Sequence, residues 1–302
     1  MTKGKNMNNL EKSILHTLSF FSAQDLAVSL LELHNLLIRV SKDQQPARVG
    51  ELRDALSGLV PGKVASQAGL FTLPNRPDLF ERRHFTYINT MKLFQKANRW
   101  ATFLRHIPYV RAVCISGSTA QMNSSDESDI DLFIIVEPKR IFLARVLVSL
   151  YFQLLGMRRH ADKVVERFCL NHYIICDLVI LEDRNHYTAM LYSSFLTLFG
   201  RSYVEEFWKA NLFWIQKYFL QAELPSSHVF EKAESPQSIA QKVLEIIFRP
   251  ISGILERLTG FYQRNRIHES EYVTVSVNQL SFHPDSKGQR ILSKYQHIAG
   301  QL

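Results

Sequence analysis

The sequence predicts a mixed α/β protein, with an α+β mixed-sheet core between an N-terminal region of short helices and a C-terminal helical region. Two apolar segments of β-type composition, 112–116 and 129–136, bracket a Gly-Ser turn near the middle of the chain. The flanking segments have apolar residues at helical spacing, interrupted by proline and glycine. The 302 residues suffice for two or three domains with a full core.

Composition narrows the class of protein. Hydrophobic residues make up 46% of the chain and charged residues 21%, which is ordinary for a folded protein. The longest apolar stretch, 141–157, contains Arg145 and is short for a bilayer span, and the first ten residues lack a signal-peptide core. The three cysteines form no CxxC pair, so we expect reduced thiols without zinc. We therefore expect a cytoplasmic protein with no membrane partner.

Residues 1–77 are predicted to form a winged-helix-like domain. Helical spacing is followed by short apolar pieces around a glycine, which gives three helices and a hairpin at 9–21, 26–40, 49–59 and 63–73. Such modules bind DNA or other proteins. The third predicted helix carries one Arg53 against Glu51 and Asp54, whereas a helix that enters the major groove is normally basic. Protein interaction is therefore favoured, and nucleic acid stays open as a partner.

Residues 78–185 are predicted to form the α/β domain, and residues 186–302 a mostly helical domain. The α/β domain begins with a long helix over 78–106, which Pro108 ends before the first strand. Glu137-Pro138 stops the second strand, and a helix and a third strand follow at 141–155 and 168–175. The remaining helices are predicted at 186–199, 203–219, 239–248 and 250–264.

The most informative motif is Gly117-Ser118 followed, after a polar spacer, by Asp129-Ile130-Asp131. Side chains alternate along a strand, so Asp129 and Asp131 share one face, roughly 6.6 Å apart along the strand. Two neighbouring carboxylates are costly without a positive partner, and a bound cation is the usual one. Backbone N–H groups at a strand-to-helix turn such as Gly117-Ser118 attract phosphate.

This pattern resembles the signature of the polymerase-beta-like nucleotidyltransferase superfamily. The resemblance implies that Gly117 and Ser118 contact a nucleoside triphosphate and that Asp129 and Asp131 bind Mg²⁺ or Mn²⁺. A hydroxyl would attack the α-phosphorus and pyrophosphate would leave. The whole chain is also similar to a group of bacterial proteins, with no assigned substrate, that place a winged-helix-like region before this domain and helices after it. The matching pieces are Phe71-Thr72-Leu73-Pro74, Gly156-Met157-Arg158-Arg159, Phe168-Cys169-Leu170-Asn171 and Tyr187-Thr188-Ala189.

The third acid of the superfamily is missing from its expected place. The centre of the third predicted strand is Asn171, which can ligate a metal through its amide oxygen but supplies neither charge nor a general base. Asp177 could replace it only in another strand register. Two interpretations of Asn171 stay open, a metal ligand and a buried amide that orders the aspartates. The chain is accordingly either an active transferase or a weakened nucleotide-binding protein that acts through its flanking domains.

Charge is distributed unevenly around the motif. Residues 112–138 hold five acids and no Lys or Arg, whereas 81–111 holds seven Lys/Arg against one acid and 139–167 seven against two. Arg158 and Arg159 precede the third strand and are the candidates for phosphate contacts; the alternative is that they complement a helix C-terminus. The sequence thus predicts a nucleotidyltransferase whose acceptor is a hydroxyl on a protein, a nucleic acid or a small molecule.

Overall fold

The fold is that of a mixed α/β protein built on a six-stranded sheet, as predicted. The computed structural model describes residues 7–160, 162–177, 180–181, 183–223, 237–266, 273–282 and 287–302. The strand order is β7-β4-β5-β6-β9-β8. The strands are β4 (Val110–Ile115), β5 (Ile130–Val136), β6 (Phe168–Ile175), β7 (Leu196–Phe199), β8 (Val273–Val275) and β9 (Gln279–Phe282).

The three central strands are apolar because both faces of the sheet are covered. All six residues of β4 are buried, and β5 is buried except at Asp131. β4 and β5 are antiparallel, as expected for strands joined by a short connection, whereas β5 and β6 are parallel. The parallel pair needs a crossover, and α6 (Ile141–Leu154) supplies it.

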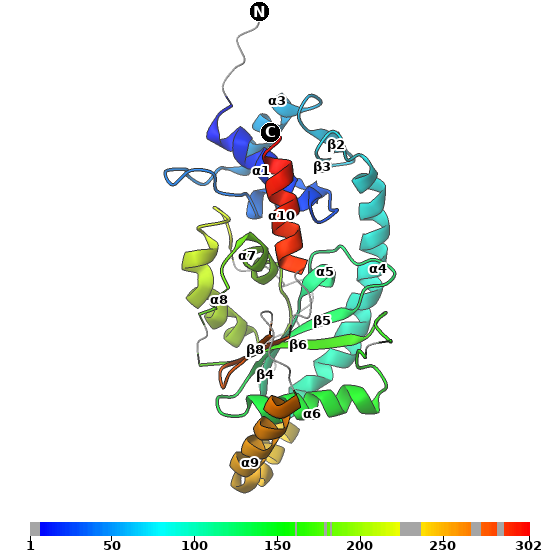
Figure 1. Ribbon diagram of the computed structural model, residues 1–302, viewed down its shortest axis with the longest axis vertical. Helices are drawn as coiled ribbons and strands as arrows, with labels where there is room; N and C mark the ends of the chain where they lie inside the picture. The colour runs from blue at the N-terminus through cyan, green and yellow to red at the C-terminus, as the bar shows by residue number, and fades with distance from the viewer. Residues whose placement is uncertain are drawn as a thin grey trace, which may run out of the picture.

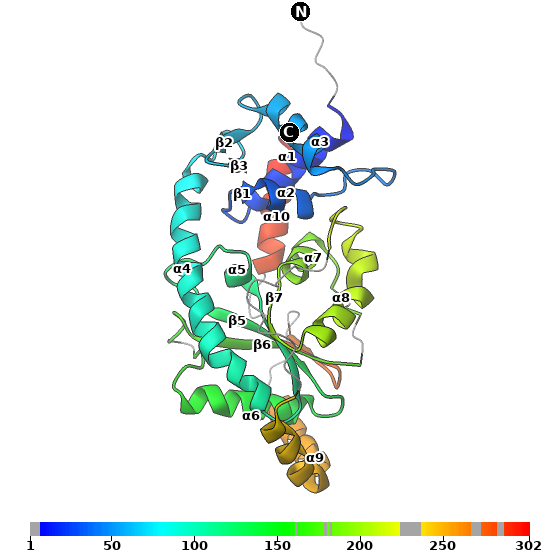
Figure 2. The same cartoon turned by 180° about the vertical axis from the view of Figure 1, so that it is seen from behind.

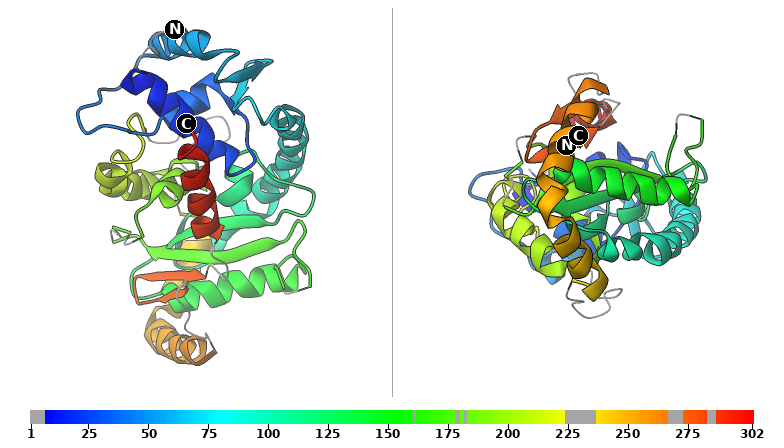
Figure 3. Two further views of the ribbon diagram at one scale, coloured as in Figure 1. Left: turned by 45° about the horizontal axis from the view of Figure 1, so that its top comes forward. Right: turned by 90° about the horizontal axis from the view of Figure 1, so that it is seen from below.

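Helices pack on both faces of the sheet (Figures 1 and 2). One face is covered by α4 (Asp78–Trp100), the 3₁₀ helix η1 (Ala101–His106) and α6. The other face is covered by α7 (His186–Ser193) and α8 (Arg201–Ile215). Figure 3 shows α9 (Ile239–Arg266) lying across α6, on the outside of the first layer.

The N-terminal region contains three helices and a small sheet. The elements are α1 (Asn9–Ser22), β1 (Val28–Ser29), α2 (Leu30–Asn35), α3 (Val49–Leu59), β2 (Ala65–Gln67) and β3 (Leu70–Thr72). The strand order is β1-β3-β2 with antiparallel pairing. α1 and α3 begin where the sequence predicts them. The predicted helix over 26–40 is shorter, because Ser29 caps α2 through a capping box with Glu32.

The helix α10 (Lys287–Ala299) joins the N-terminal region to the face of the sheet that α7 and α8 cover. One continuous hydrophobic core contains residues of α1, α3, β4, β5, α7, α8 and α10. At its centre, the rings of Phe20, His186, Phe219 and Tyr295 pack at centroid distances of 5.5–6.3 Å. Trp208 and Trp214 are also buried in this core, as the sequence indicated for the aromatic residues of this segment.

Two segments differ from the predicted secondary structure. The C-terminal part supplies three strands of the main sheet, β7, β8 and β9, where the sequence predicted mostly helix. These strands are short, so tertiary pairing decides their conformation more than local pattern does. The two predicted helices around Pro250 are one helix, α9, with the proline inside it. Within the described residues, no helix combines the length and the apolar character needed to cross a membrane.

Candidate functional site

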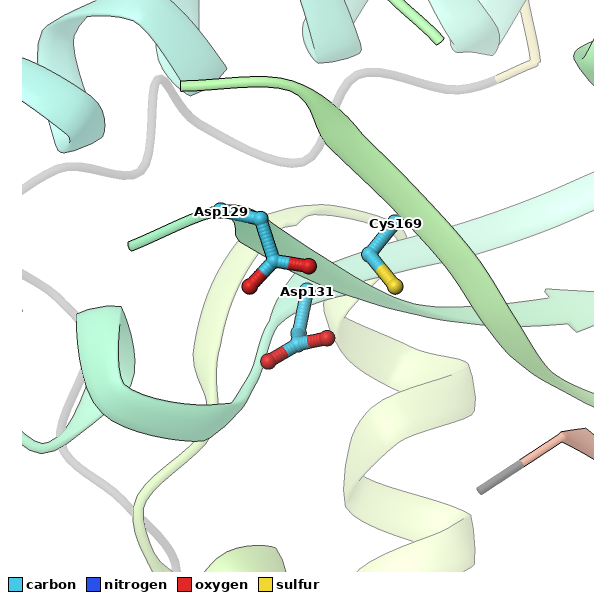
Figure 4. A group of neighbouring side chains, drawn as sticks. All are labelled: Asp129, Asp131 and Cys169. Atoms are coloured by element: carbon cyan, nitrogen blue, oxygen red, sulfur yellow. The ribbon is translucent and has the colours of Figure 1, made fainter. Parts of the chain in front are cut away.

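A cluster of two carboxylates and one thiol lies at the start of β5. Asp129 directly precedes β5 and Asp131 is its second residue. Figure 4 shows both side chains on the same side of the strand, with Cys169 of β6 turned toward them. One ligand atom from each of these residues can be chosen so that all three lie within 4.8 Å of one another. The alternation predicted from the sequence is therefore what brings the two aspartates together.

Gly117 brings its backbone against the carboxylate of Asp131. It is the first residue of the short helix α5 (Gly117–Ala120) and has a φ of 63°, which is unfavourable for other residues. A Cβ at this position would lie 2.3 Å from Oδ2 of Asp131. Only glycine, which has no Cβ, can both adopt this φ and lie this close to the carboxylate of Asp131.

The loop between α5 and β5 is held by helix α4 and by the turn that follows α1. The guanidinium of Arg83 in α4 donates to the backbone oxygen of Gln121 at 3.2 Å, and Thr90 accepts from the N–H of Ser124 at 3.1 Å. The side chain of Asn123 donates to the backbone oxygen of Gln24, two residues after the end of α1, at 3.0 Å. These contacts fix the polar spacer of the motif, so the glycine turn and the aspartates have a defined separation.

Burial raises the pKa of Asp131. Desolvation is the larger cause and the charge of Asp129 the second, and together they bring the pKa to about 6. Lys287, the Cys169 thiol and Arg159 offset part of this shift. A crowded acid pair of this kind gains stability from a bound cation, because the cation compensates both charges.

Cys169 is the residue opposite Asp131 across the β5–β6 pairing. Its thiol lies 2.6 Å from Oδ1 of Asn171, to which it donates. Burial and the two aspartates raise the pKa of the thiol well above its usual range, with partial compensation by Arg159. The thiol is therefore neutral, and a neutral thiol is a poor ligand for Mg²⁺, which prefers oxygen.

Arg159 forms an ion pair with the cluster. Its Nη1 lies 2.6 Å from Oδ2 of Asp129 and 3.3 Å from the sulfur of Cys169. The residue directly follows Arg158, whose backbone bridges to Phe168 at the start of β6. This bridge holds Arg158 and Arg159 beside the start of β6, so the two arginines lie at the end of the strands where the site is.

A pocket of about 330 Å³ lies next to the cluster and has a cationic lining. Its walls include Arg145, Arg158, Arg159, His160, Cys169 and Asn171. Burial and the nearby Arg158 lower the pKa of Arg145, which indicates how closely these positive groups are placed. Such a pocket favours an anion with several oxygens, since guanidinium groups pair with phosphate through two hydrogen bonds.

Helices α7 and α10 each place one residue near the cluster. Lys287 at the start of α10 is close enough to lower the pKa of Asp131. Burial and the charge of Asp131 raise the pKa of Tyr187 in α7 to about 12. A Cβ on Gly288 would meet the ring of Tyr187 at 2.8 Å, so the two helices are in close contact.

The structure brings most of the residues predicted from the sequence into one region. Asp129, Asp131, Gly117 and Arg159 are in direct contact through the pairs described above, with Ser118 next in the turn. Arg158 and Asn171 line the adjacent pocket. Asn171 touches the cluster through Cys169. Among the described residues, its side chain hydrogen-bonds to Cys169 and to neither aspartate.

Three residues of this region were not singled out from the sequence. Cys169 could have been found, because it lies two residues before Asn171 and therefore on the same face of the strand. Lys287 and Tyr187 come from distant segments. Tyr187 stood out in the sequence only within the matching piece Tyr187-Thr188-Ala189, without a predicted role, and Lys287 carried no local signal. Asp177, the alternative third acid, lies beyond the other end of β6 and lines a separate pocket with Tyr203 and Lys209.

Comparison with known proteins gives no further assignment: no family model, curated protein or solved structure matches the chain.

Proposed function

We propose that the chain is a metal-dependent nucleotidyltransferase that transfers a nucleoside monophosphate from a nucleoside triphosphate to a hydroxyl acceptor. The observation that carries the proposal is the backbone of Gly117 packed against the carboxylate of Asp131, beside Asp129. In this arrangement a turn whose N–H groups are suited to phosphate lies beside a pair of carboxylates suited to a metal ion. The strand pairing supports the proposal. Because β4–β5 is antiparallel and β5–β6 is parallel, the turn and both acids lie at the same end of these central strands.

The residues present fit Mg²⁺ or Mn²⁺. Mg²⁺ is commonly bound by one or two carboxylates together with water and substrate phosphates, and Asp129 and Asp131 meet that requirement. The closely spaced acid pair and the raised pKa of Asp131 are consistent with a cation site whose charges a bound cation would compensate. When bound, the metal would shield the charge of the α-phosphate and lower the pKa of the attacking hydroxyl.

The protein groups would act mainly by position and charge. The N–H groups of the Gly117-Ser118 turn would hold the phosphates, and Arg158 and Arg159 would neutralise the oxygens that become pyrophosphate. The acceptor oxygen bonds to the α-phosphorus as the bond to the β-phosphate oxygen breaks. Its proton passes to a carboxylate of the pair or to water. Arg159 would leave Asp129 for the phosphates as the metal binds.

A second candidate function is nucleotide binding without efficient transfer. It is favoured by the neutral thiol of Cys169 opposite Asp131 and by Asn171 beyond it, where the superfamily signature has an acid. In this case the flanking parts would carry the biological role. The helix and strand order of residues 7–77, with sheet order β1-β3-β2, supports a winged-helix-like module. Glu51, Arg53 and Asp54 are exposed on α3, so a protein partner is favoured over DNA.

The proposal is tested by replacing both aspartates. We expect Asp129→Asn/Asp131→Asn to abolish Mg²⁺-dependent binding of nucleoside triphosphates in calorimetry. The metal-free variant should melt at the same temperature as the parent or higher, because the crowded pair is removed. The matched control, Asp43→Asn/Asp177→Asn, removes two exposed acids away from the cluster and should bind as the parent does. Equal Mg²⁺-dependent affinity in the double variant and the parent would contradict the proposal.

Transfer is separated from binding by measuring pyrophosphate. The parent is incubated with each labelled triphosphate and Mg²⁺ or Mn²⁺, with and without cell extract as a source of acceptor. Pyrophosphate release that the double variant lacks supports the transferase. Nucleotide binding without pyrophosphate release under every condition supports the binding protein instead.

A further inference from the structure

Helix α9 presents its polar side to the protein and its apolar side to solvent. The residues of α9 that are buried are Gln241, Ser252, Gly260 and Gln263, all polar or small. Most of its large aliphatic and aromatic side chains are exposed, with 82% for Ile239 and 71% for Ile246 and Phe261. An ordinary surface helix has the reverse orientation.

The inward side is held by specific polar contacts. Glu245 accepts from the guanidinium of Arg111 at 2.9 Å, and Gln241 donates to the backbone oxygen of Val110 at 2.6 Å. Glu256 accepts from the N–H of Leu143 at 2.8 Å, where it caps the start of α6. Gln263 donates to the backbone oxygen of Phe142 at 2.8 Å. These positions recur at intervals of four, eleven and seven residues, which are close to whole numbers of helical turns, so they define one side of the helix and fix its orientation.

The outward side is a continuous apolar strip. It runs the length of the helix through residues that lie on the side opposite the inward contacts: Ile239, Val243, Ile246, Ile247, Ile254, Leu258 and Phe261. A strip of this length is larger than the single exposed apolar residues that any protein surface carries. Its exposure follows from the inward contacts, because the helix cannot turn without breaking them.

The exposed charges of α9 are all positive. Lys242, Arg249, Arg257 and Arg264 are exposed and recur at intervals of seven and eight residues, beside the apolar strip. The acids of the helix are Glu245 and Glu256, and both are engaged with the protein. The free side of α9 is therefore apolar and cationic, without a compensating acid of its own.

We infer that α9 docks on an anionic lipid surface and lies flat in its headgroup region. Apolar residues on one side and Lys/Arg beside them are the two features by which interfacial helices bind such membranes. The position of α9 agrees with this, since it forms the end of the molecule opposite the N-terminal region (Figures 1 and 2). A flat surface can reach the strip there. A second copy of the chain fits less well, because joining two such sides would bring together cations with no acid to pair them.

This inference is independent of the proposed nucleotidyltransferase activity. It departs from the expectation of no membrane partner, which depended on the absence of a segment able to span a bilayer. A search for spanning segments measures the length of apolar runs, whereas a helix lying in the surface needs only one apolar side.

The test is flotation of the full-length protein with vesicles. One set contains phosphatidylcholine alone, and the other contains phosphatidylcholine and phosphatidylglycerol in equal parts. We expect binding to the anionic vesicles that weakens as salt is added. Ile254→Ser/Phe261→Ser should reduce it roughly tenfold or more, because two large apolar groups no longer enter the lipid. Lys242→Gln/Arg257→Gln should also reduce it roughly tenfold or more, since each cation near an anionic surface contributes about fivefold.

The matched control is Leu31→Ser/Phe85→Ser, which removes one aliphatic and one aromatic side chain of 63% and 57% exposure away from α9. It should bind vesicles as the parent does, and far-ultraviolet circular dichroism should show that all variants are folded. No binding to either vesicle, or equal binding to both, overturns the inference. A dimer in light scattering that Ile254→Ser/Phe261→Ser disperses, without vesicle binding, also overturns it and assigns the strip to a second copy.

Discussion

Cys169, opposite Asp131, is the position at which an acid would complete the proposed metal site. Its thiol lies with the two carboxylates, whereas Asn171 reaches them only through that thiol. A carboxylate at 169 would add a charged oxygen ligand on the metal, and affinity for divalent cations rises with the charge of the ligand set.

We therefore expect Cys169→Asp to raise Mg²⁺-dependent nucleotide affinity roughly tenfold or more, and Asn171→Asp to raise it less. Both affinities are measured by calorimetry, together with the rate of pyrophosphate release. Cys169→Ser is the control, since it removes the sulfur without adding charge. A larger effect at 171 than at 169 would make Asn171 the third ligand position.

His186 makes the stability of the protein sensitive to acid. Burial in the aromatic core lowers the pKa of His186 to about 4, and the nearby His16 adds to the effect. The neutral ring is the form that the folded state accommodates, so this contribution is complete above pH 6.5. It is lost as the pH falls from 6.5 toward 4.

We expect the parent to lose about 3 kcal/mol of unfolding free energy over that range through His186. His186→Phe keeps an aromatic ring in the cluster and should make the loss correspondingly smaller. The measurement is urea denaturation at a series of pH values. Parallel pH profiles of the parent and the variant would show that His186 does not titrate in this way.

At the scale of elements, the junction between β4 and α5 is the most constrained part of the site. Gly117→Ala would place a methyl group on Oδ2 of Asp131 and would require a positive φ of alanine. The positive φ alone costs about 1–2 kcal/mol. The contact additionally requires the carboxylate of Asp131 to shift from its position.

We expect Gly117→Ala to lower Mg²⁺-dependent nucleotide affinity about 10-fold or more, the loss typical when the support of a metal ligand is disturbed. Gly69→Ala is the matched control, because Gly69 also has a positive φ, of 79°, but nothing lies within 4 Å of its Cβ position. That variant should lose stability and keep its affinity. Equal nucleotide affinity in both glycine variants would show that the turn at Gly117 does not support the proposed metal site.

At the scale of the whole molecule, α10 couples the N-terminal region to the site. The charge of its first residue, Lys287, lowers the pKa of Asp131. Near its other end, the ring of Tyr295 packs edge-on against Phe20 of α1 at a centroid distance of 5.5 Å. The hydroxyl of Tyr295 also pairs with Nδ1 of His16 at 3.1 Å. The shared core means that the N-terminal region and the sheet stabilise each other.

We expect the described parts that share this core to unfold in a single transition. Tyr295→Ala should lower the unfolding free energy by about 3–5 kcal/mol, the usual range for losing a large buried aromatic ring. Tyr295→Phe keeps the ring and should lose about 1 kcal/mol with the hydroxyl contact. Unfolding is followed by circular dichroism and by tryptophan fluorescence together. Two separate transitions would mean that the regions fold independently.

The sequence by itself determined the local features of the fold and of the candidate site. α3, α6 and β6 lie where apolar spacing and the stop signals predict them, because such elements are set by patterns within a few residues. The same period-two pattern predicted that Asp129 and Asp131 share a face, and the glycine turn was visible as a motif. Each of these depends on neighbours along the chain.

Only the tertiary structure decided which distant segments meet. β8 and β9 are too short for their sequence to determine them. β9 pairs with β6 and β8 pairs with β9, and these pairings supply their hydrogen bonds. Lys287 and Tyr187 reach Asp131 through the packing of α7 and α10, and Cys169 faces it through strand register. The orientation of α9 also could not be predicted from the sequence. Its amphipathic pattern is visible there, but which side faces the protein depends on partners such as Arg111 and the start of α6.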